Sequence, residues 1–356
     1  MTAAVLQNLH KPRMGEDSIT LDLVTQTPLY TGGIGQWGDQ IHPSGLLGSI
    51  RFFSCLVART LGDTGFEDAV WGNAGGDNHH ARGVALRWDV SGLKPVTLPE
   101  KLEFQREDIA RKRAWYYNQA YTGRLKLTVT RRNISDKHWN RFLLALRIQI
   151  RHGTFGAKDQ FGLGVLSADH LPPVKPLNEQ INYPRASGLY LCCFGLVKLG
   201  RKPGNREELD IPQALRLGLA TRIAMRDALR PSTDAPTAEQ QHWKTIRHRM
   251  MGVLNEYGSA VNISAAYPLD DSSSSASLRF IIRIPRTSEE LSQELSQELI
   301  KKQKSQERTE IFKRLFGAFE KLALDGWNIH GITREFGGNC GGFNHPAKWL
   351  NKIAGI

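Results

Sequence analysis

The chain has 356 residues, of which 40% are hydrophobic, and its 47 Lys and Arg against 35 Asp and Glu give a formal net charge of +12. This composition excludes general disorder, and the length suits two domains of ordinary size. The positive excess favours a polyanionic partner, most simply a nucleic acid; a protein that is basic for another reason is the alternative.

The cysteines and the apolar segments indicate where in the cell the protein is expected. No two cysteines show C-x-x-C spacing, which argues against a zinc knuckle and against a disulfide framework and fits a reducing cytoplasm. Residues 1–17 lack the apolar run of a secretory signal, and the strongly apolar run 189–197 is too short to span a bilayer as a helix. We therefore expect a cytoplasmic protein that has no membrane segment, metal site or cofactor.

The first half of the chain alternates strand and helix signals. Strands are expected at 18–30, 85–90, 123–132 and 165–171, with a connector or the approach to another strand at 93–108. Ser44 is expected to cap a helix over 46–61, and Ser135 or Asp136 a helix over 137–152. This order predicts a split βαβ, ferredoxin-like unit over 18–168, with both helices on one face of the sheet and the other face free for a partner.

The second half repeats a similar order after a proline-rich linker at 172–184. We expect strands at 187–200, 259–269 and 275–285, a helix capped by Asp210, a second helix over 242–254, a long helix over 287–325 and a glycine-rich loop over 334–349. The predicted fold class is thus α+β, with tandem ferredoxin-like (RRM-like) domains over 1–172 and 185–356. In this second half, a solvated or subunit-facing stripe is expected from Arg216, Arg222, Arg226 and Arg230, of which the last three share a helix face.

The segment GTFGAKDQFGLG, residues 153–164, places four glycines around Lys158. It lacks a Walker A pattern, and it follows a helix, whereas a dinucleotide-binding fingerprint follows a strand. Glycines allow close backbone approach to a phosphate, and successive N–H groups can form an anion nest. A helix end followed by a tight turn accounts for at most two of the four glycines. The motif therefore indicates a cradle for a backbone phosphate rather than for a nucleotide cofactor.

Three segments together resemble a known superfamily. They are TPLYTGG (27–33), HPSGLLGSIRFF (42–53) and GAKDQFGLGVL (156–166). In this order they resemble the RAMP superfamily of CRISPR effector complexes, and within it the large head-end subunit of the Cmr, or type III-B, complex. The resemblance covers residues 18–168 with recognisable motifs, and beyond 185 only the order of elements agrees. Asp159 and Gln160 stand where the family often has basic residues.

The resemblance implies a non-catalytic subunit that binds guide RNA or the guide–target duplex near the 3′ end of the guide. It also implies target RNA and other RAMP subunits as partners in a cytoplasmic antiviral complex. The positions carried over as RNA contacts are Gly33, Ser44, Arg51, Lys158 and Gly162. For Arg51, pairing with an acid such as Asp22 is the alternative.

A second feature is independent of any family. Residues 101–151 are strongly basic, and within them Arg111, Lys112 and Arg113 run into Trp115 and Tyr116. Basic side chains grip phosphates, and neighbouring aromatic rings can stack on splayed bases, so the segment is expected to contact RNA. Arg131 and Arg132 can extend the same surface. An exposed loop whose aromatic rings cover the core is the alternative.

Few residues suggest catalysis. His79 and His80, with His42 as a possible neighbour, could act as acid and base on RNA or bind a metal, but adjacent residues point in different directions and the pattern favours a polar turn. Asp39 lies in the loop where related backbone subunits carry an aspartate that cuts target RNA, but its spacing differs from theirs.

Two other functions stay open. One is a RAMP endoribonuclease that processes guide precursors through the histidines or cuts target RNA through Asp39. The other is a structural bridge between subunits that uses the helix over 287–325 and binds no RNA.

Overall fold

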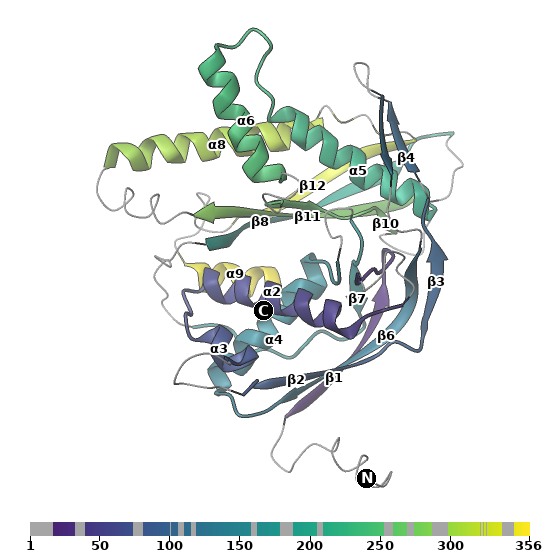
Figure 1. Ribbon diagram of the computed structural model, residues 1–356, viewed down its shortest axis with the longest axis vertical. Helices are drawn as coiled ribbons and strands as arrows, with labels where there is room; N and C mark the ends of the chain where they lie inside the picture. The colour runs from purple at the N-terminus through teal and green to yellow at the C-terminus, as the bar shows by residue number, and fades with distance from the viewer. Residues whose placement is uncertain are drawn as a thin grey trace.

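The computed structural model shows a mixed α+β protein in which two antiparallel sheets are separated by a layer of helices (Figure 1). The residues that the structure describes are 17–32, 40–73, 81–99, 101–105, 110–114, 119–157, 162–178, 188–204, 209–252, 259–268, 274–286, 298–320, 322, 324, 326–336 and 345–356.

The first sheet has the strand order β2-β6-β1-β7, with β3 also paired to β6. Its core elements are, in chain order, β1 (Ser18–Thr25), α2 (Pro43–Thr60), β2 (Val84–Asp89), β6 (Gln119–Arg131), α4 (Asp136–His152) and β7 (Leu166–Ala168). All neighbouring strands are antiparallel, which is the pairing of a split βαβ unit and confirms the ferredoxin-like prediction. Additional elements are α3 (Phe66–Trp71), β3 (Leu93–Thr97) and a separate hairpin of β4 (Lys101–Gln105) and β5 (Ala110–Ala114).

The second sheet repeats this arrangement, with the order β10-β11-β8-β12 and with β9 paired to β11. Its elements are β8 (Gly188–Arg201), α5 (Ile211–Ala228), α6 (Thr237–Met251), β9 (Val261–Ile263), β10 (Tyr267–Pro268), β11 (Ser275–Arg286), α8 (Glu298–Glu320), β12 (Trp327–Phe336) and α9 (Pro346–Ala354). The structure therefore has two ferredoxin-like arrangements in tandem, as the sequence predicts.

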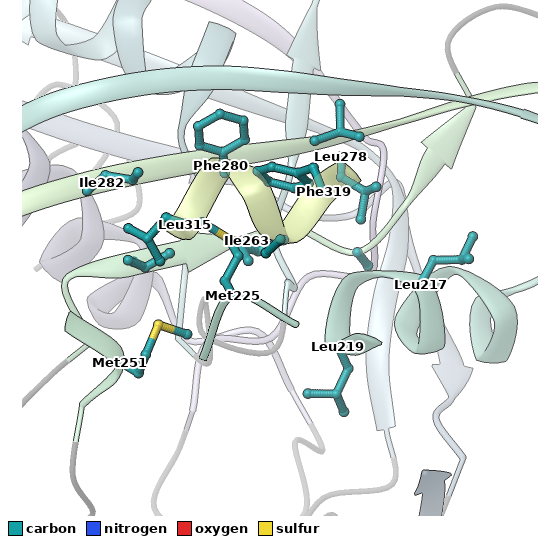
Figure 2. Packing of buried hydrophobic residues seen from close by; sticks show 14 of the residues in the cluster. Leu217, Leu219, Met225, Met251, Ile263, Leu278, Phe280, Ile282, Leu315 and Phe319 are labelled. Carbon is teal, nitrogen blue, oxygen red and sulfur yellow. The ribbon is translucent and has the colours of Figure 1, made fainter. Parts of the chain in front are cut away.

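The helices lie in two layers. Helices α2 and α4 of the first half, together with α9 from the end of the chain, lie between the two sheets, while α5, α6 and α8 cover the far side of the second sheet (Figure 1). Phe53 of α2 and Leu144 of α4 pack in one buried cluster with Phe194 of β8 and Trp349 of α9. On the far side, Met225, Phe280 and other apolar residues of α5, β11 and α8 form the largest core cluster (Figure 2). The second sheet is thus covered on both faces.

No described helix covers the outer face of the first sheet, which agrees with the expected arrangement (Figure 1). Leu21 and Leu23 of β1 are buried, whereas the alternate residues Thr20 and Asp22 are exposed on the outer face. The outward residues on β1, β2 and 124–130 are polar, charged or aliphatic, so these strands lack the aromatic side chains with which RNA-binding sheets stack bases. Base stacking therefore has no platform on these strands.

The helix starts follow capping rules with one exception. The Ser135 hydroxyl accepts a hydrogen bond from the backbone N–H of His138, and Asp210 Oδ1 accepts one from Gln213 at 2.7 Å, so both predicted caps are correct. The predicted cap at Ser44 is wrong. Helix α2 already begins at Pro43, because proline is favoured in a first turn, and His42 is its N-cap without a side-chain bond.

Several local predictions in the second half are also wrong. Arg222 is 9% exposed, and its guanidinium donates to the carbonyl oxygens of Val261 at 2.8 Å and Met251 at 2.9 Å, so it is not part of a solvated stripe. Residues 334–336 belong to β12 and 346–349 to α9, where the sequence suggested a loop. Cys192 is disulfide-bonded, against the expectation of no disulfides, while Cys55 and Cys193 are free.

None of the described helices has both the length and the apolar content that a membrane span requires.

Candidate nucleic-acid interface

The glycine-rich segment 153–164 begins at the end of α4. The backbone N–H of Gly153 donates to the carbonyl oxygen of Gln149 at 2.7 Å and ends the helix. The backbone then returns beside residues 28–30, because the N–H groups of Ala157 and Gly164 donate to the carbonyl oxygens of Tyr30 at 2.7 Å and Pro28 at 2.9 Å. Lys158 lies outside the described residues. The segment is thus held firmly against the chain that follows β1.

All four glycines have a reason within the fold. Gly156, Gly162 and Gly164 have φ between +81° and +84°, a region that side chains with a Cβ rarely adopt. A Cβ on these residues would also collide with the backbone of Tyr30, Ala265 and Phe155, respectively, and one on Gly153 would meet the Gln149 carbonyl oxygen at 2.9 Å. The expectation that packing explains at most two glycines is therefore wrong. Phosphate approach is not needed to account for any of them.

The motif segments of the sequence nevertheless meet in space. A Cβ placed on Gly32 would lie 3.8 Å from the Cβ of Ala157, so the loop after β1 touches the glycine-rich segment. The Ser49 hydroxyl of α2 donates to the carbonyl oxygen of Thr154 at 3.4 Å. The glycine-rich stretch, which lies far along the chain from the other two, therefore contacts both of them. Gly33 lies outside the described residues.

Two of the carried-over side chains are on α2. Ser44 is exposed in the first turn of the helix. Arg51 is half exposed, and its Nη2 donates to Glu67 Oε1 of α3 at 2.9 Å. Asp22, the alternative partner, instead lies 3.5 Å from Lys126 Nζ. Exposed ion pairs of this kind contribute at most about 1 kcal/mol, so Arg51 can exchange its partner for a phosphate.

The basic segment forms a hairpin. Arg111, Lys112 and Arg113 lie on β5, with their Cα atoms paired to those of Phe104, Glu103 and Leu102 on β4. Figure 1 shows this hairpin projecting beyond the first sheet, beside α5. Trp115 and Tyr116 lie outside the described residues. The prediction that this segment contacts RNA stays a prediction.

Arg131 and Arg132 have different environments. The Arg131 guanidinium lies 3.2 Å from Asp17 Oδ2 and 2.6 Å from Asp136 Oδ1, and its Nε donates to the Ile134 carbonyl oxygen at 3.1 Å. These contacts give Arg131 a role in joining the end of β6 to the start of α4. The side chain of Arg132 is exposed.

The possible catalytic residues Asp39, His79 and His80 lie outside the described residues. His42 is described, and its backbone N–H donates to the Thr31 hydroxyl at 2.8 Å. In the part of the chain that the structure describes, no three His, Cys, Asp or Glu side chains gather in a way that could hold a metal ion.

Sequence reasoning missed the contribution of the second sheet. Arg279 of β11 reaches the end of α4, and a cavity of about 310 Å³ opens where α2, the end of α4 and the second sheet meet. Arg283 of β11 and Asn262 of β9 line this cavity together with Gly48 and Phe52 of α2. No local pattern could reveal it, because its walls come from segments far apart in the sequence.

Comparison with known proteins gives structural matches only. No protein-family model matches the chain, and no curated protein matches it. Among solved structures, the chain is similar to Cmr1 from Pyrococcus furiosus in its apo form, with 11% identity over 76% of this chain and 89% of that one and a TM-score of 0.38.

Two further matches are assemblies. A chain of the type III-B Cmr-beta complex bound to cognate target RNA and AMPPnP shows 10% identity over 85% of this chain and 99% of that one, with a TM-score of 0.43. A chain of a type IV-B CRISPR complex shows 16% identity over 46% of this chain and 96% of that one, with a TM-score of 0.30.

Proposed function

We propose that this chain is a RAMP-type subunit of a cytoplasmic type III CRISPR effector complex. In this proposal it binds guide RNA, or the guide–target duplex, near the 3′ end of the guide and does no chemistry itself. Its partners are the guide, the target RNA and other RAMP subunits.

One observation carries the proposal: the three motif segments that resemble the superfamily converge in the structure. The loop after β1 contacts Ala157, and the first turns of α2 contact Thr154. A chance resemblance of three short stretches gives no reason for them to form one surface. The solved structures described above have TM-scores below 0.5 and are not needed for this argument.

The charge and the fold support RNA as the ligand. The net charge of +12 favours a polyanion, and the half-exposed Arg51 on the motif surface can contact a phosphate. Because the outward residues on β1, β2 and 124–130 include no aromatic side chain, we place the RNA along the convergent motif surface and the β4–β5 hairpin. Binding there should be dominated by phosphate contacts and weaken steeply with salt.

The test is to express the tagged chain with its genomic neighbours, purify it and sequence the RNA that accompanies it. We expect guide RNAs with uniform repeat-derived 5′ ends, together with other RAMP subunits. A chain that binds no RNA in isolation, and whose complex is unchanged when Arg111, Lys112 and Arg113 are neutralised, would instead support a structural bridge.

The non-catalytic part needs its own assay. Purified protein is incubated with labelled guide precursor and with guide–target duplex, each with and without Mg²⁺. We expect intact RNA in all four reactions. Cleavage that disappears in Asp39→Ala, or in the double variant His79→Ala and His80→Ala, would establish a ribonuclease instead.

A further inference from the structure

The cavity between the two halves has a defined set of walls. Gly48 and Phe52 of α2 form one side, Gln149 near the end of α4 another, and Asn262 and Arg283 of the second sheet the third. Its volume of about 310 Å³ lies at the small end of the range for ligand sites, which is roughly 300 to 1,000 Å³. A cavity of this size suits one base or nucleoside rather than several.

Gly48 has no structural reason to be glycine. It lies in the interior of α2, where glycine is disfavoured relative to alanine. A Cβ on the neighbouring cavity residue Gly45 would approach the Thr31 side chain to 2.9 Å, but one on Gly48 would meet nothing within 4 Å. Packing thus explains Gly45 and leaves Gly48 unexplained. The missing side chain keeps the cavity open on the helix side.

Phe52 offers an aromatic ring at this cavity. It is 50% exposed, one of two large hydrophobic side chains that are strongly exposed among the described residues. The guanidinium carbon of Arg283 lies 5.4 Å from the centre of its ring. Arg283 is only 7% exposed, and its Nη2 donates to Asn262 Oδ1 at 2.7 Å. A planar ring that enters the cavity therefore meets an aromatic surface beside an oriented, buried cation.

Gln149 adds polar groups to the wall. It is 1% exposed, and its Nε2 donates to the Ser49 hydroxyl at 3.1 Å and to the Thr154 carbonyl oxygen at 2.9 Å. Its Oε1 is buried and accepts no hydrogen bond from the part of the chain that is described. Buried amide oxygens are normally paired, and none of the described residues donates to this one. No carboxylate is among the described residues that line the cavity, which suits a ligand attached to a phosphate backbone.

We propose that this cavity takes the base of one unpaired RNA nucleotide, stacked on Phe52, while its phosphate stays on the motif surface outside. The inference rests on the proposed function, because it names the part of an RNA strand that one region of that surface recognises. Stacking on an aromatic side chain tolerates every base, so the cavity adds affinity and fixes the register of the strand with little sequence preference.

The test uses short single-stranded RNAs that carry one 2-aminopurine, moved through each position in turn, and the full-length chain. We expect one position to show strongly altered fluorescence on binding, since stacking quenches this base. Gly48→Leu should fill the cavity, abolish that signal and weaken RNA binding roughly ten-fold. Phe52→Ala should lower the same signal without filling the cavity.

A matched control is available on α8. Gly317 is also a helical glycine with nothing within 4 Å of an added Cβ, and α8 lies on the far side of the second sheet from α2. Gly317→Leu should leave both the signal and the affinity unchanged. Because leucine is a better helix former than glycine, neither variant should lower the melting temperature, so a loss of binding cannot be ascribed to unfolding.

The contrary outcomes separate the two proposals. If Gly48→Leu binds RNA as tightly as Gly317→Leu and no 2-aminopurine position responds, the base cavity is wrong while RNA binding stands. If Gly48→Leu keeps its RNA but loses a neighbouring subunit from the purified complex, the cavity holds a protein side chain and the inference is overturned. If the unaltered protein binds no RNA at all, the proposed function fails as well.

Discussion

Arg279 of β11 donates a hydrogen bond from Nη1 to the carbonyl oxygen of Ile150 in α4 at 2.8 Å, and so joins the second sheet to the last turn of a first-half helix. The same nitrogen lies 3.4 Å from the carbonyl oxygens of Gly153 and Leu166. A cation at this position satisfies carbonyl groups that the helix leaves unpaired and meets the negative end of its dipole. The Arg279 Nε also donates to the Tyr267 hydroxyl at 2.9 Å, which fixes the direction of the side chain.

Replacing Arg279 should therefore weaken the contact between the halves. We expect Arg279→Ala to lower the free energy of unfolding by about 2 kcal/mol or more, since charge-assisted bonds to backbone carbonyls contribute about 1.5–3 kcal/mol. The control is Arg124→Ala, which removes an exposed arginine 3.9 Å from Asp169 and should cost less than about 0.5 kcal/mol. Urea unfolding followed by tryptophan fluorescence gives both values. Equal stabilities for the two variants would contradict this role of Arg279.

In the glycine-rich segment, the energetic cost of a steric collision can be measured separately from the cost of a positive φ. Gly164 and Gly204 have nearly the same φ, +83° and +84°, but a Cβ on Gly164 would collide with the Phe155 carbonyl oxygen, whereas one on Gly204 would meet nothing within 4 Å. Gly204→Ala should cost about 1 kcal/mol for the left-handed conformation alone. Gly164→Ala should cost at least about 2 kcal/mol more, because the backbone must move. Thermal unfolding of both variants measures the difference. Similar losses of stability would show that the backbone of the glycine-rich segment shifts at little energetic cost.

The sequence predicts the two ferredoxin-like arrangements because their signals are local. The alternation of β1 and the caps Ser135 and Asp210 depend on neighbours within a few residues. The reason for Gly162 is not local, because its neighbour in space is Ala265 of the other half. A count of glycines cannot separate such packing from phosphate binding. The glycine count therefore predicts a ligand that the packing does not require.

Two other predictions failed because one strand lies at the edge of a sheet and one arginine is buried. Among the described strands, β8 alone is hydrogen-bonded to β12, and Asn328 and Arg334 are exposed, so the apolar alternation that marks a strand is weak. Arg222 has the spacing of a polar stripe, but it is buried because it satisfies the Met251 and Val261 carbonyl oxygens. Spacing alone does not show whether an arginine faces solvent or the backbone of another segment.

Neutralising the hairpin should change the salt dependence of RNA binding. If Arg111, Lys112 and Arg113 each contact a phosphate, replacing all three by Gln lowers the slope of log affinity against log salt by about 2 for a single strand. The control replaces three exposed lysines elsewhere, Lys175, Lys244 and Lys313, and removes the same net charge. Fluorescence anisotropy over a salt series gives both slopes. The same slope in both variants would mean that only the net charge matters.

The pair of Arg51 and Glu67 tests the start of α2. If Arg51 contacts phosphate, Arg51→Gln should weaken RNA binding several-fold, whereas Glu67→Gln should strengthen it, since the competing carboxylate 2.9 Å away is removed. A purely structural ion pair would give the same small loss of stability in both variants and no change in affinity. Opposite signs in a binding titration at low salt are therefore the expected result.

His152 should make stability depend on pH. Its Nε2 donates to the Ile353 carbonyl oxygen at 2.8 Å, and burial, followed by the nearby Arg279 and Arg151 charges, lowers its pKa to about 4. The unfolded chain, with an ordinary pKa near 6.5, then binds more protons than the folded protein between these values. Stability is thus complete above pH 6.5 and falls as the pH decreases towards 4, by about 1–2 kcal/mol between pH 7 and pH 5.

His152→Gln isolates this contribution, because its amide can still donate to the Ile353 carbonyl oxygen but does not titrate. The variant should lose less stability than the unaltered protein between pH 7 and pH 5, while carboxylate titration below pH 5 acts on both alike. Urea unfolding at half-unit pH steps measures the two curves. Parallel curves would mean that His152 takes up its proton in the folded state near the ordinary pKa, and that the contact between α9 and the end of α4 tolerates a charge.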